Sequence, residues 1–284
     1  MKQKKVAIQG IEGAFHEIAA VNHYGALIDI IPCSSFTELV KTVETQKADY
    51  GMMAIENTVA GSILPNYDLI RNSSVVIVGE EYLRIKQNLV GLPGQKIDDI
   101  KEVHSHYMAI SQCRNFFKAF PSIKLIESED TALSAKEIAT KKLTNYGGIS
   151  SDLAAKKYGL EILAPDIETN KINYTRFFSL ASNANLNHEK NINKASLSFS
   201  VPHKKASLSS VLSVLAFYDL NLTKIESMPL MGKAFQYLFY IDVTFENYEK
   251  FKQCIGAISP LIYDFQLLGE YNYNIETLQK LHEL

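Results

Sequence analysis

The sequence is organised around one run, Asn173-Tyr174-Thr175-Arg176-Phe177-Phe178-Ser179-Leu180. Aromatic and aliphatic residues dominate it, so it predicts a buried β-strand. Thr175 and Arg176 are adjacent there, and neighbouring side chains of a strand point to opposite faces. A buried guanidinium needs an anionic partner or a wet cleft. We therefore expect Thr175 and Arg176 at the chemical end of a cleft that binds a small carboxylate.

The composition changes abruptly after this run. Ser182–Lys194 contains five asparagines and no apolar cluster, so it cannot bury enough surface to order itself. We therefore predict a first domain of residues 1–182, a linker of residues 183–193 and a second domain of residues 194–284.

Strand and helix patterns alternate through the first domain. This repeated βα order predicts an α/β fold with a parallel, doubly wound sheet or two such lobes. The expected strands include Val6–Gln9, Leu27–Pro32, Tyr50–Ile55, Val75–Gly79 and Asn88–Leu92, and the expected helices include Phe15–Tyr24, Phe36–Gln46, Met108–Phe120 and Thr131–Lys142.

The second domain follows a different pattern. Its strands and helices are expected in the order βαββαβ, with strands such as Ala195–Val201 and Ala234–Phe245 and a helix over Ala206–Tyr218. That order predicts a ferredoxin-like unit. Because such a small sheet commonly pairs with a second copy, we expect a homodimer or homotetramer.

Composition narrows the functional class. A net charge of −2 argues against nucleic acid or an anionic membrane as the main partner. The three cysteines are isolated and odd in number, which fits a reducing compartment and gives no zinc framework. His104 and His106 could chelate a metal, but no third ligand follows at a suitable spacing, so we expect no metal. The N-terminus has no signal-peptide pattern, and we expect a cytoplasmic protein.

Two segments of the first domain are candidate binding loops. A carboxylate, an amide and two hydroxyls lie in Glu56–Ser62, just past the expected strand Tyr50–Ile55, where ligands bind in open α/β sheets. Alternatively, Asn57 and Thr58 only cap the helix that follows. The turn Gly10–Gly13 could bind an anion at a helix N-terminus, or it could be a simple connection.

Taken together, five segments resemble prephenate dehydratase followed by an ACT regulatory domain. The family's glycine turn, Gly-Pro-Glu-Gly-Thr-Phe-Ser, corresponds to Gly10–His16. Its Ile-Glu-Asn-(Ser/Thr) motif with a later glycine corresponds to Ile55–Gly61. Its Ser-His-Pro-Gln…Gln-Cys segment corresponds to Ser105–Cys113, although Tyr107 and Met108 depart from it. The Tyr-Gly-Leu…Ile-Leu signature is present in Tyr158–Leu163, and Asn…Thr-Arg-Phe in Asn173–Phe177. The resemblance covers essentially the whole chain.

The resemblance implies a fold and a reaction. The fold is a two-lobed, type II periplasmic-binding-protein-like catalytic domain with the active site between its lobes, followed by the ACT domain. The reaction converts prephenate to phenylpyruvate with loss of carbon dioxide and water, and needs no cofactor. The implied catalytic residues are Thr175, Arg176, Asn57, Glu56 and Gln112, and the implied substrate-binding residues are Thr58, Gly61, Ser62, Phe177, His106 and Phe15.

Chemistry suggests a role for each leading residue. Thr175 resembles the family's proton donor to the departing hydroxyl, although a lone threonine in a strand is more often only a β-former. Arg176 suits the retained carboxylate because its fork binds two oxygens, and its alternative is a structural ion pair. A second carboxylate beside a dianion is unfavourable, so we expect Glu56 to orient groups or pair with Arg176. Phe177 is expected to be core or an apolar wall.

Several positions depart from the family pattern. Ala14 and His16 replace hydroxyl residues in the first turn, so a substrate contact there is lost or supplied by His16. The resemblance also implies phenylalanine as a feedback regulator. Its site would include Ala206, Ser207, Leu208, Glu226 and Ser227. Ala206 stands where the family has glycine, and Met228 stands where it has arginine.

Two other functions stay open at this point. A solute-binding or sensor protein would share the two lobes and Arg176 but would not need Thr175. An enzyme that acts on arogenate would give phenylalanine directly, and the sequence does not separate the two substrates.

Overall fold

The structure is a computed structural model, and it describes residues 3–183, 191–230, 232 and 235–273. The chain forms two compact units. One consists of residues 1–62 and 81–177, and the other of residues 63–80 and 178–284. The second unit therefore includes residues 63–80 in addition to the predicted C-terminal domain. The predicted boundaries at 182 and 194 stay predictions, and residues 184–190 of the predicted linker lie outside the described residues.

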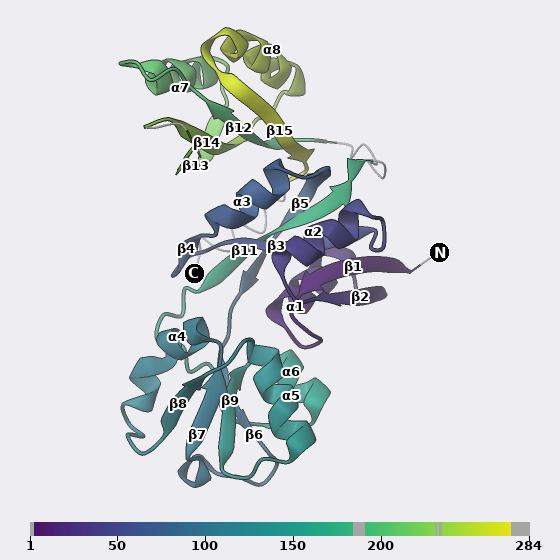
Figure 1. The fold of residues 1–284 in the computed structure, drawn as a ribbon, viewed down its shortest axis with the longest axis vertical. Coiled ribbons are helices and arrows are strands. Elements are labelled where there is room, and N and C mark those ends of the chain that lie inside the picture. The colour runs from purple at the N-terminus through teal and green to yellow at the C-terminus, as the bar shows by residue number, and fades with distance from the viewer. Residues whose placement is uncertain (1–2, 184–190, 231, 233–234, 274–284) are drawn as a thin grey trace. The chain divides into compact units, whose positions relative to one another are not determined.

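The first lobe of the first unit is built on parallel strands. Buried Val6, Ala7 and Ile8 form the centre of β1, which pairs in parallel with β2 and β3 (Figure 1). Its elements are β1 (Lys4–Gln9), α1 (Phe15–Tyr24), β2 (Ile28–Cys33), α2 (Phe36–Glu44), β3 (Tyr50–Asn57) and β4 (Gly61–Ser62), with the first residues of β11 (Tyr174–Ser182) beside β3. The predicted bounds of α1 are confirmed.

The second lobe has its own five-stranded sheet in the order β10-β6-β9-β7-β8. It follows the last residues of β5 (Val75–Arg84) and consists of β6 (Asn88–Gly91), η1 (Ile97–Asp99), β7 (Glu102–Ser105), α4 (Tyr107–Phe117), β8 (Lys124–Glu127), α5 (Thr131–Lys141), β9 (Tyr146–Ser150), α6 (Asp152–Tyr158) and β10 (Glu161–Ala164).

The prediction of a wholly parallel sheet is wrong for this lobe. β6 runs antiparallel to both β9 and β10, whereas β7 is parallel to β8 and β9. Parallel neighbours need a crossover of a dozen or more residues, usually a helix. Only a short loop with the single turn η1 separates β6 from β7, so the sequence between them does not supply such a crossover.

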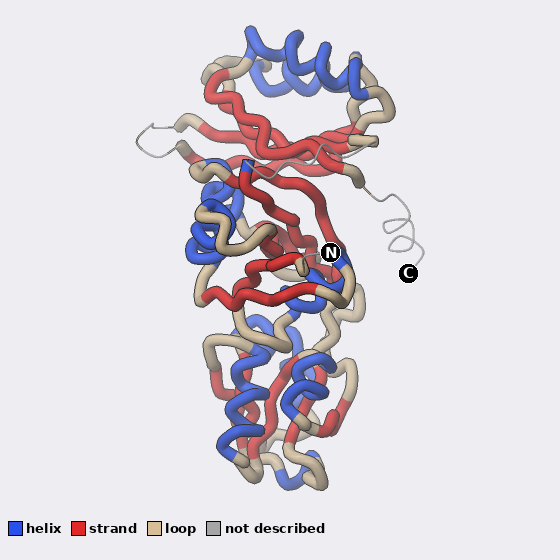
Figure 2. Tube along the Cα trace, turned by 90° about the vertical axis from the view of Figure 1, so that its right-hand side faces the viewer, coloured by secondary structure: helices blue, strands red, loops and turns tan. Residues whose placement is uncertain are grey.

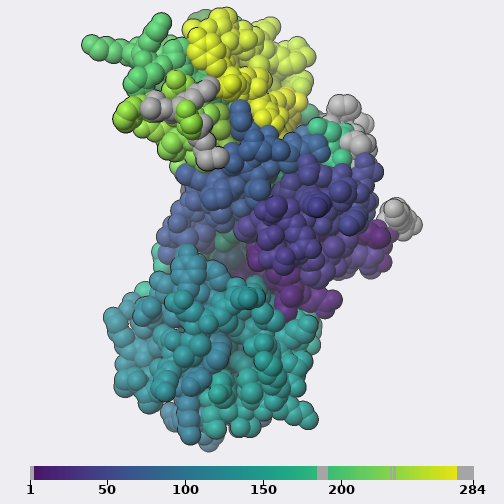
Figure 3. Space-filling view, in the orientation of Figure 1, coloured from purple at the N-terminus to yellow at the C-terminus, as the bar shows by residue number. Residues whose placement is uncertain are grey.

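The two lobes contact each other at the glycine turn. Ser151 Oγ donates to the Gly13 carbonyl at 2.7 Å, and Tyr158 Oη donates to the Glu12 carbonyl at 2.6 Å. A Cβ on Gly13 would lie 2.9 Å from Ala154 Cα, so only glycine allows this approach. In Figure 3 the purple surface of the first lobe meets the teal surface of the second.

The same contacts decide between the two interpretations of the turn. The Gly13 amide donates to Glu17 Oε2 at 2.6 Å, and Lys157 Nζ lies 2.7 Å from Glu17 Oε1. The side chain of Glu17 thus occupies the amide that an anion would need. The turn is a connection that joins the lobes.

The second unit contains the ferredoxin-like order that the sequence predicts. Its sheet has the order β13-β14-β12-β15-β5, and Figure 2 shows the α-helices of the βαββαβ segment on one face of it. Its elements are α3 (Leu64–Arg71), β12 (Lys194–Ser200), α7 (Ser207–Phe217), β13 (Asn221–Pro229), β14 (Tyr237–Thr244), α8 (Tyr248–Ile258), η3 (Ser259–Leu261) and β15 (Tyr263–Tyr271), with the first residues of β5.

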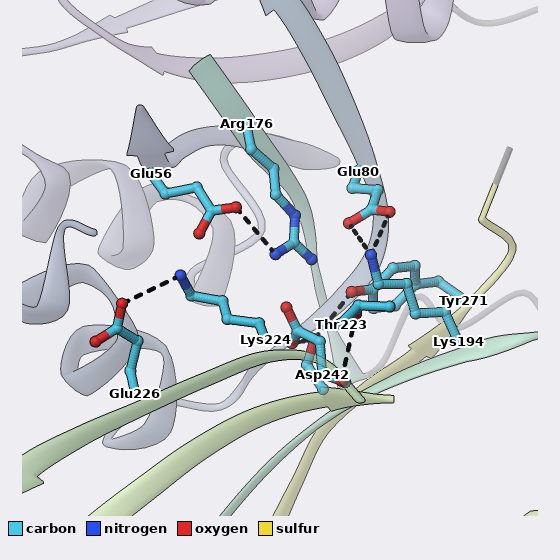
Figure 4. A network of polar contacts seen from close by, with 10 residues as sticks. Glu56, Glu80, Arg176, Lys194, Thr223, Lys224, Glu226, Asp242 and Tyr271 are labelled. Atoms are coloured by element: carbon cyan, nitrogen blue, oxygen red, sulfur yellow. Dashed lines mark hydrogen bonds and ion pairs between the residues drawn. The ribbon is translucent and has the colours of Figure 1, made fainter. Parts of the chain in front are cut away.

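Residues 63–80 pack closely against this sheet. The Tyr67 ring lies 5.2 Å from the Tyr240 ring, and Arg71 Nε donates to Ser198 Oγ at 3.2 Å. Lys194 Nζ lies 2.8 Å from Glu80 Oε1, and both side chains are about 2% exposed (Figure 4). These contacts explain why residues 63–80 belong to the second unit.

No helix among the described residues is both long enough and apolar enough to cross a membrane.

Candidate functional site

Strand β11 places its polar side chains on two different faces. Tyr174 and Arg176 share one face of the strand, and Thr175 and Phe177 share the other, because side chains alternate. From Thr175 onward every residue of the strand is buried. Thr175 and Arg176 therefore do not reach one ligand from the same side of the strand.

The face of Arg176 opens into a cavity of about 240 Å³. Six predicted site residues line it with two tyrosines: Glu56, Asn57, Thr58, Gly61, Ser62, Tyr82, Tyr174 and Arg176. The structure thus brings the Glu56–Ser62 segment to Arg176, as the sequence predicts. Tyr174 was missed although it lies two residues from Arg176, which is the spacing of one strand face. Tyr82 was missed because its polar neighbours predicted a connection.

Arg176 is only 3% exposed and has an acidic neighbour within its own unit. Its Nη1 lies 3.6 Å from Glu56 Oε1, and Figure 4 shows the guanidinium directed toward that carboxylate. Its Cζ lies 5.9 Å from the centre of the Tyr82 ring. The expected pairing of Glu56 with Arg176 is confirmed.

Asn57 joins the end of β3 to the start of β11. Its Oδ1 accepts from the amides of Val59 and Ala60, both at 2.9 Å. Its Nδ2 therefore faces β11, where it lies 2.8 Å from Asn173 Oδ1 and 3.0 Å from Thr175 Oγ1. Because two amides fix the oxygen, the orientation of this side chain is determined.

Thr58 secures the same junction. Its Oγ1 donates to the Ile172 carbonyl at 3.0 Å and accepts from the Tyr174 amide at 2.9 Å. The hydrogen and the oxygen of this hydroxyl group are thus both hydrogen-bonded to the backbone at the start of β11. Thr58 lines the cavity, but its hydrogen bonds hold the loop.

Thr175 is 9% exposed and accepts a hydrogen bond from Asn57. A hydroxyl has one hydrogen and two lone pairs. Because Asn57 occupies one lone pair as a donor, the hydroxyl hydrogen of Thr175 is directed elsewhere. It can be donated to a ligand.

Gln112 lies outside the cavity but is connected to it. Its Oε1 accepts from Asn173 Nδ2 at 3.0 Å and from Gln87 Nε2 at 3.4 Å. Asn173, which is fully buried, in turn accepts from Asn57. Two predicted site residues, Asn57 and Gln112, are thus linked through Asn173, for which no role was predicted from the sequence.

His16 packs beside the Thr175 face. Its ring centre lies 5.1 Å from that of Phe177 and 5.6 Å from that of Phe36. Burial lowers the pKa of His16 to about 4, so the imidazole is neutral near pH 7. Its Nε2 is buried and has no hydrogen-bond partner among the described residues. Phe15 is the first residue of α1 and does not line the cavity.

His106 caps helix α4 and does not line the cavity. Its Nδ1 accepts from the Met108 amide at 3.3 Å. Burial lowers the pKa of His106, although Asp130 and Glu127 oppose this. Asp130 caps α5 through the amides of Ala132 and Leu133, and burial raises its pKa.

The predicted regulatory residues lie in the second unit and do not all meet. A cavity of about 440 Å³ is lined by residues that include Ser207, Leu208 and Tyr237. Ala206 precedes them with φ at 66°, the left-handed conformation that glycine favours. Glu226 and Ser227 lie on β13 and do not line this cavity, and Glu226 Oε1 lies 3.5 Å from Lys224 Nζ.

Comparison with known proteins gives a consistent result. The family description "Prephenate dehydratase" matches residues 6–185. Arogenate dehydratase 2 of Petunia hybrida is 35% identical over 282 residues, which cover 94% of this chain and 71% of that protein. The bifunctional chorismate mutase/prephenate dehydratase of Aquifex aeolicus is 34% identical over 272 residues, covering 95% and 74%.

Two solved structures share the whole fold at 26% identity. The prephenate dehydratase from Arthrobacter aurescens in complex with L-Phe has a TM-score of 0.84 and covers 95% of this chain and 90% of that chain. GqqA, described as a novel type of quorum quenching acylase, has a TM-score of 0.86, covering 96% and 100%.

Proposed function

Because this chain belongs to the prephenate dehydratase family, we propose that it removes carbon dioxide and water from prephenate to give phenylpyruvate, in phenylalanine biosynthesis. Such an enzyme is a carbon–oxygen lyase. The observation that carries the proposal is the hydrogen bond from Asn57 Nδ2 to Thr175 Oγ1, which leaves the hydrogen of Thr175 available to a leaving hydroxyl.

The reaction needs a proton at one place only. As the bond from the ring to its carboxylate breaks, the electron pair of that bond enters the ring. The ring hydroxyl departs with the electron pair of the C–O bond. Thr175 gives its proton to that oxygen, so water leaves, and the threonine regains a proton from solvent. Aromatisation drives these steps, and the resemblance implies no cofactor.

Asn57 makes this use of a threonine physically reasonable. A threonine is a weak acid, and it can assist only through a well-aimed hydrogen bond in a nearly concerted step. The amide of Asn57 already donates to Oγ1, so it stabilises the negative charge that develops there. The amides of Val59 and Ala60 bind its Oδ1, so Nδ2 rather than Oδ1 faces the threonine.

Arg176 is the cation that we assign to the retained carboxylate of the substrate. It lines the cavity, and its planar fork can bind two carboxylate oxygens. Glu56 holds the guanidinium at 3.6 Å and competes with a substrate for it. Arg176 and Thr175 lie on opposite faces of β11, so the substrate would extend around the start of the strand, past Asn57.

A direct assay tests the function. The full-length protein is incubated with prephenate at neutral pH, and phenylpyruvate is followed by its absorbance in alkali. Arogenate is tested in parallel, and kcat/KM for the two substrates is compared. We expect turnover of prephenate. Binding without turnover of either substrate would instead support the solute-binding alternative and reject the proposal.

The similarity to an acylase gives a second candidate. Hydrolysis of an amide needs a nucleophile activated by a base. Among the described residues, Thr175 Oγ1 accepts a side-chain hydrogen bond from Asn57, and a donor to this oxygen does not activate it as a nucleophile. We therefore favour the lyase. Release of a free amine from an N-acylated substrate, with no turnover of prephenate, would reverse this preference.

We assign the second unit to an ACT domain that binds phenylalanine as a regulator in a homodimer or homotetramer. The order βαββαβ supports the fold, and a similar protein was solved with L-Phe. Ala206 keeps the left-handed backbone of a glycine, so the loop shape is preserved despite the added methyl group. Inhibition of turnover by phenylalanine, but not by alanine, is the expected result. The cytoplasmic location stays a prediction.

A further inference from the structure

A chain of side-chain amides leads away from Thr175 through the buried part of the catalytic unit. It runs from Asn57 to Asn173 at 2.8 Å, from Asn173 to Gln112 at 3.0 Å, and from Gln87 to Gln112 at 3.4 Å. Asn173 and Gln87 are 0% and 3% exposed, so water does not compete freely for these bonds. Such buried bonds fix side-chain orientation.

The direction of every bond in the chain is determined. Asn57 must present Nδ2 to Asn173, because its Oδ1 accepts from the backbone. Asn173 therefore accepts through Oδ1 and donates through Nδ2 to Gln112 Oε1. If the Asn173 amide turned over, two N–H groups would face each other at Asn57 and two oxygens at Gln112.

The chain also crosses between the lobes. Asn57 ends β3 and Asn173 directly precedes β11 in the first lobe, whereas Gln112 lies on helix α4 of the second. The same helix is bound to the connection between β10 and β11, because the Gln112 backbone carbonyl accepts from the Thr169 amide at 2.8 Å. A displacement of the second lobe would therefore lengthen or break the hydrogen bond between Asn173 and Gln112.

We propose that Asn173 and Gln112 are positioning residues for Thr175, holding Asn57 so that the threonine hydroxyl is aimed only while the second lobe is in place. This inference rests on the proposed function. It adds a role for Asn173 and assigns the Gln112 oxygen to positioning. The Nε2 of Gln112 has no protein partner among the described residues, so that end is still available to a substrate.

The test is a double-mutant cycle on prephenate turnover. Asn173→Ala should lower kcat roughly 10- to 100-fold, as expected when a catalytic group is misplaced by about 1 Å, with little change in KM. Thr175→Ala should lower kcat more. The double variant should be no slower than Thr175→Ala alone, because Asn173 acts through Thr175.

Gln112→Met provides a second variant that removes the acceptor oxygen at similar size. Its loss of kcat should not multiply with that of Asn173→Ala. Asn88→Ala is the matched control, since Asn88 is a buried asparagine of the same unit whose side chain, among the described residues, bonds to the backbone of Asp166 and Ser150. It should lower the melting temperature and leave kcat unchanged.

Each failure has its own signature. If Thr175→Ala slows turnover but Asn173→Ala does not, or if their losses multiply, the positioning role is rejected and the proposed function stands. If the wild-type protein does not convert prephenate, the proposed function fails first. Should Asn173→Ala not fold, Gln112→Met in the Thr175→Ala background decides the question alone.

Discussion

Thr175 carries the chemical step in our proposal, and Asn57 donates a hydrogen bond to its hydroxyl oxygen. General-acid assistance is typically worth about 10²- to 10⁴-fold. Thr175→Ala should therefore lower kcat within that range and change KM little. Thr175→Ser keeps the oxygen and should retain much of the rate. Steady-state kinetics on prephenate measures both, and an Ala variant as fast as the wild type would remove the assignment.

Arg176 can be tested by a substitution that keeps its charge. Arg176→Lys should raise KM for prephenate, because an ammonium does not reproduce the two-pronged contact with a carboxylate. Glu56→Gln is the matched change. It removes the negative charge that lies 3.6 Å from the Arg176 guanidinium and competes with the substrate carboxylate, so it should lower KM for prephenate. If Arg176→Lys only lowers the melting temperature and leaves KM unchanged, the ion pair is structural.

His16 should make the stability of the protein depend on pH. Its pKa is about 4 when folded, against 6.5 ordinarily, because burial disfavours the imidazolium. The unfolded chain therefore binds the proton first as the pH falls. Stability is complete above pH 6.5 and decreases toward pH 4, by up to about 3 kcal/mol at 1.36 kcal/mol per pKa unit.

Comparing variants isolates this contribution. Denaturant unfolding at pH 7 and pH 4.5 should show a smaller difference for His16→Ser than for the wild type. His203→Asn is the control, because His203 is exposed. Equal pH dependence in the wild type and His16→Ser would show that the imidazole is not buried as a neutral group.

At the scale of residues, the sequence predicted which side chains meet but not how they are directed. Residue types placed Glu56 with Arg176, because a buried guanidinium needs an anion. The amide directions of Asn57 and Asn173 depend on backbone N–H groups that only the fold positions. The place of Tyr82 in the cavity could not be predicted, because strand β5 continues through a polar stretch that indicated a connection.

Among the elements, the turn before α1 depends on glycine for both its conformation and its packing. Gly13 has φ of 91°, and an added Cβ would meet the backbone of Ala154 at 2.9 Å. Gly13→Ala should lower the free energy of unfolding by at least about 1–3 kcal/mol, which is typical of such backbone strain, and more from the clash.

Gly256→Ala is the matched control for this change. Gly256 lies within helix α8, and an added Cβ would have nothing within 4 Å. It should stabilise the protein by up to about 1 kcal/mol, since alanine favours a helix. Thermal unfolding measures both variants, and a Gly13→Ala variant as stable as the wild type would contradict the tight contact between the lobes.

Element positions were predicted well where apolar periodicity was strong, as for α2, whose predicted start at Phe36 is confirmed. Strand β5 extends to Arg84, beyond the predicted end at Gly79, because paired polar residues such as Glu80 continue it. The direction of β6 was also missed. Periodicity identifies a strand, but whether it runs parallel or antiparallel to its neighbours depends on the connection that follows it. That connection contains only the three-residue turn η1, which has no recognisable sequence pattern.

The whole molecule is expected to associate through its C-terminal sheet. Tyr263, Phe265 and Leu267 alternate along β15 and are 38–60% exposed. Exposed apolar rows of this kind are typical of interaction surfaces. Replacing Phe265 and Leu267 by lysine should shift the protein toward monomers in sedimentation velocity. Phe217→Lys, at the end of α7, is the control and should not; a wild-type monomer at all concentrations would reject this expectation.

The ion pair between Lys194 and Glu80 limits how this protein can be dissected. A truncation that begins at residue 194 keeps the βαββαβ segment but removes Glu80, whose carboxylate lies 2.8 Å from the Lys194 ammonium, and the loss of one partner of a buried ion pair typically costs about 3–5 kcal/mol. It also exposes the surface of Tyr240 that the Tyr67 ring covers. The compact unit that contains the βαββαβ segment is therefore discontinuous in the sequence, and transferring it to another protein would require residues 63–80 as well.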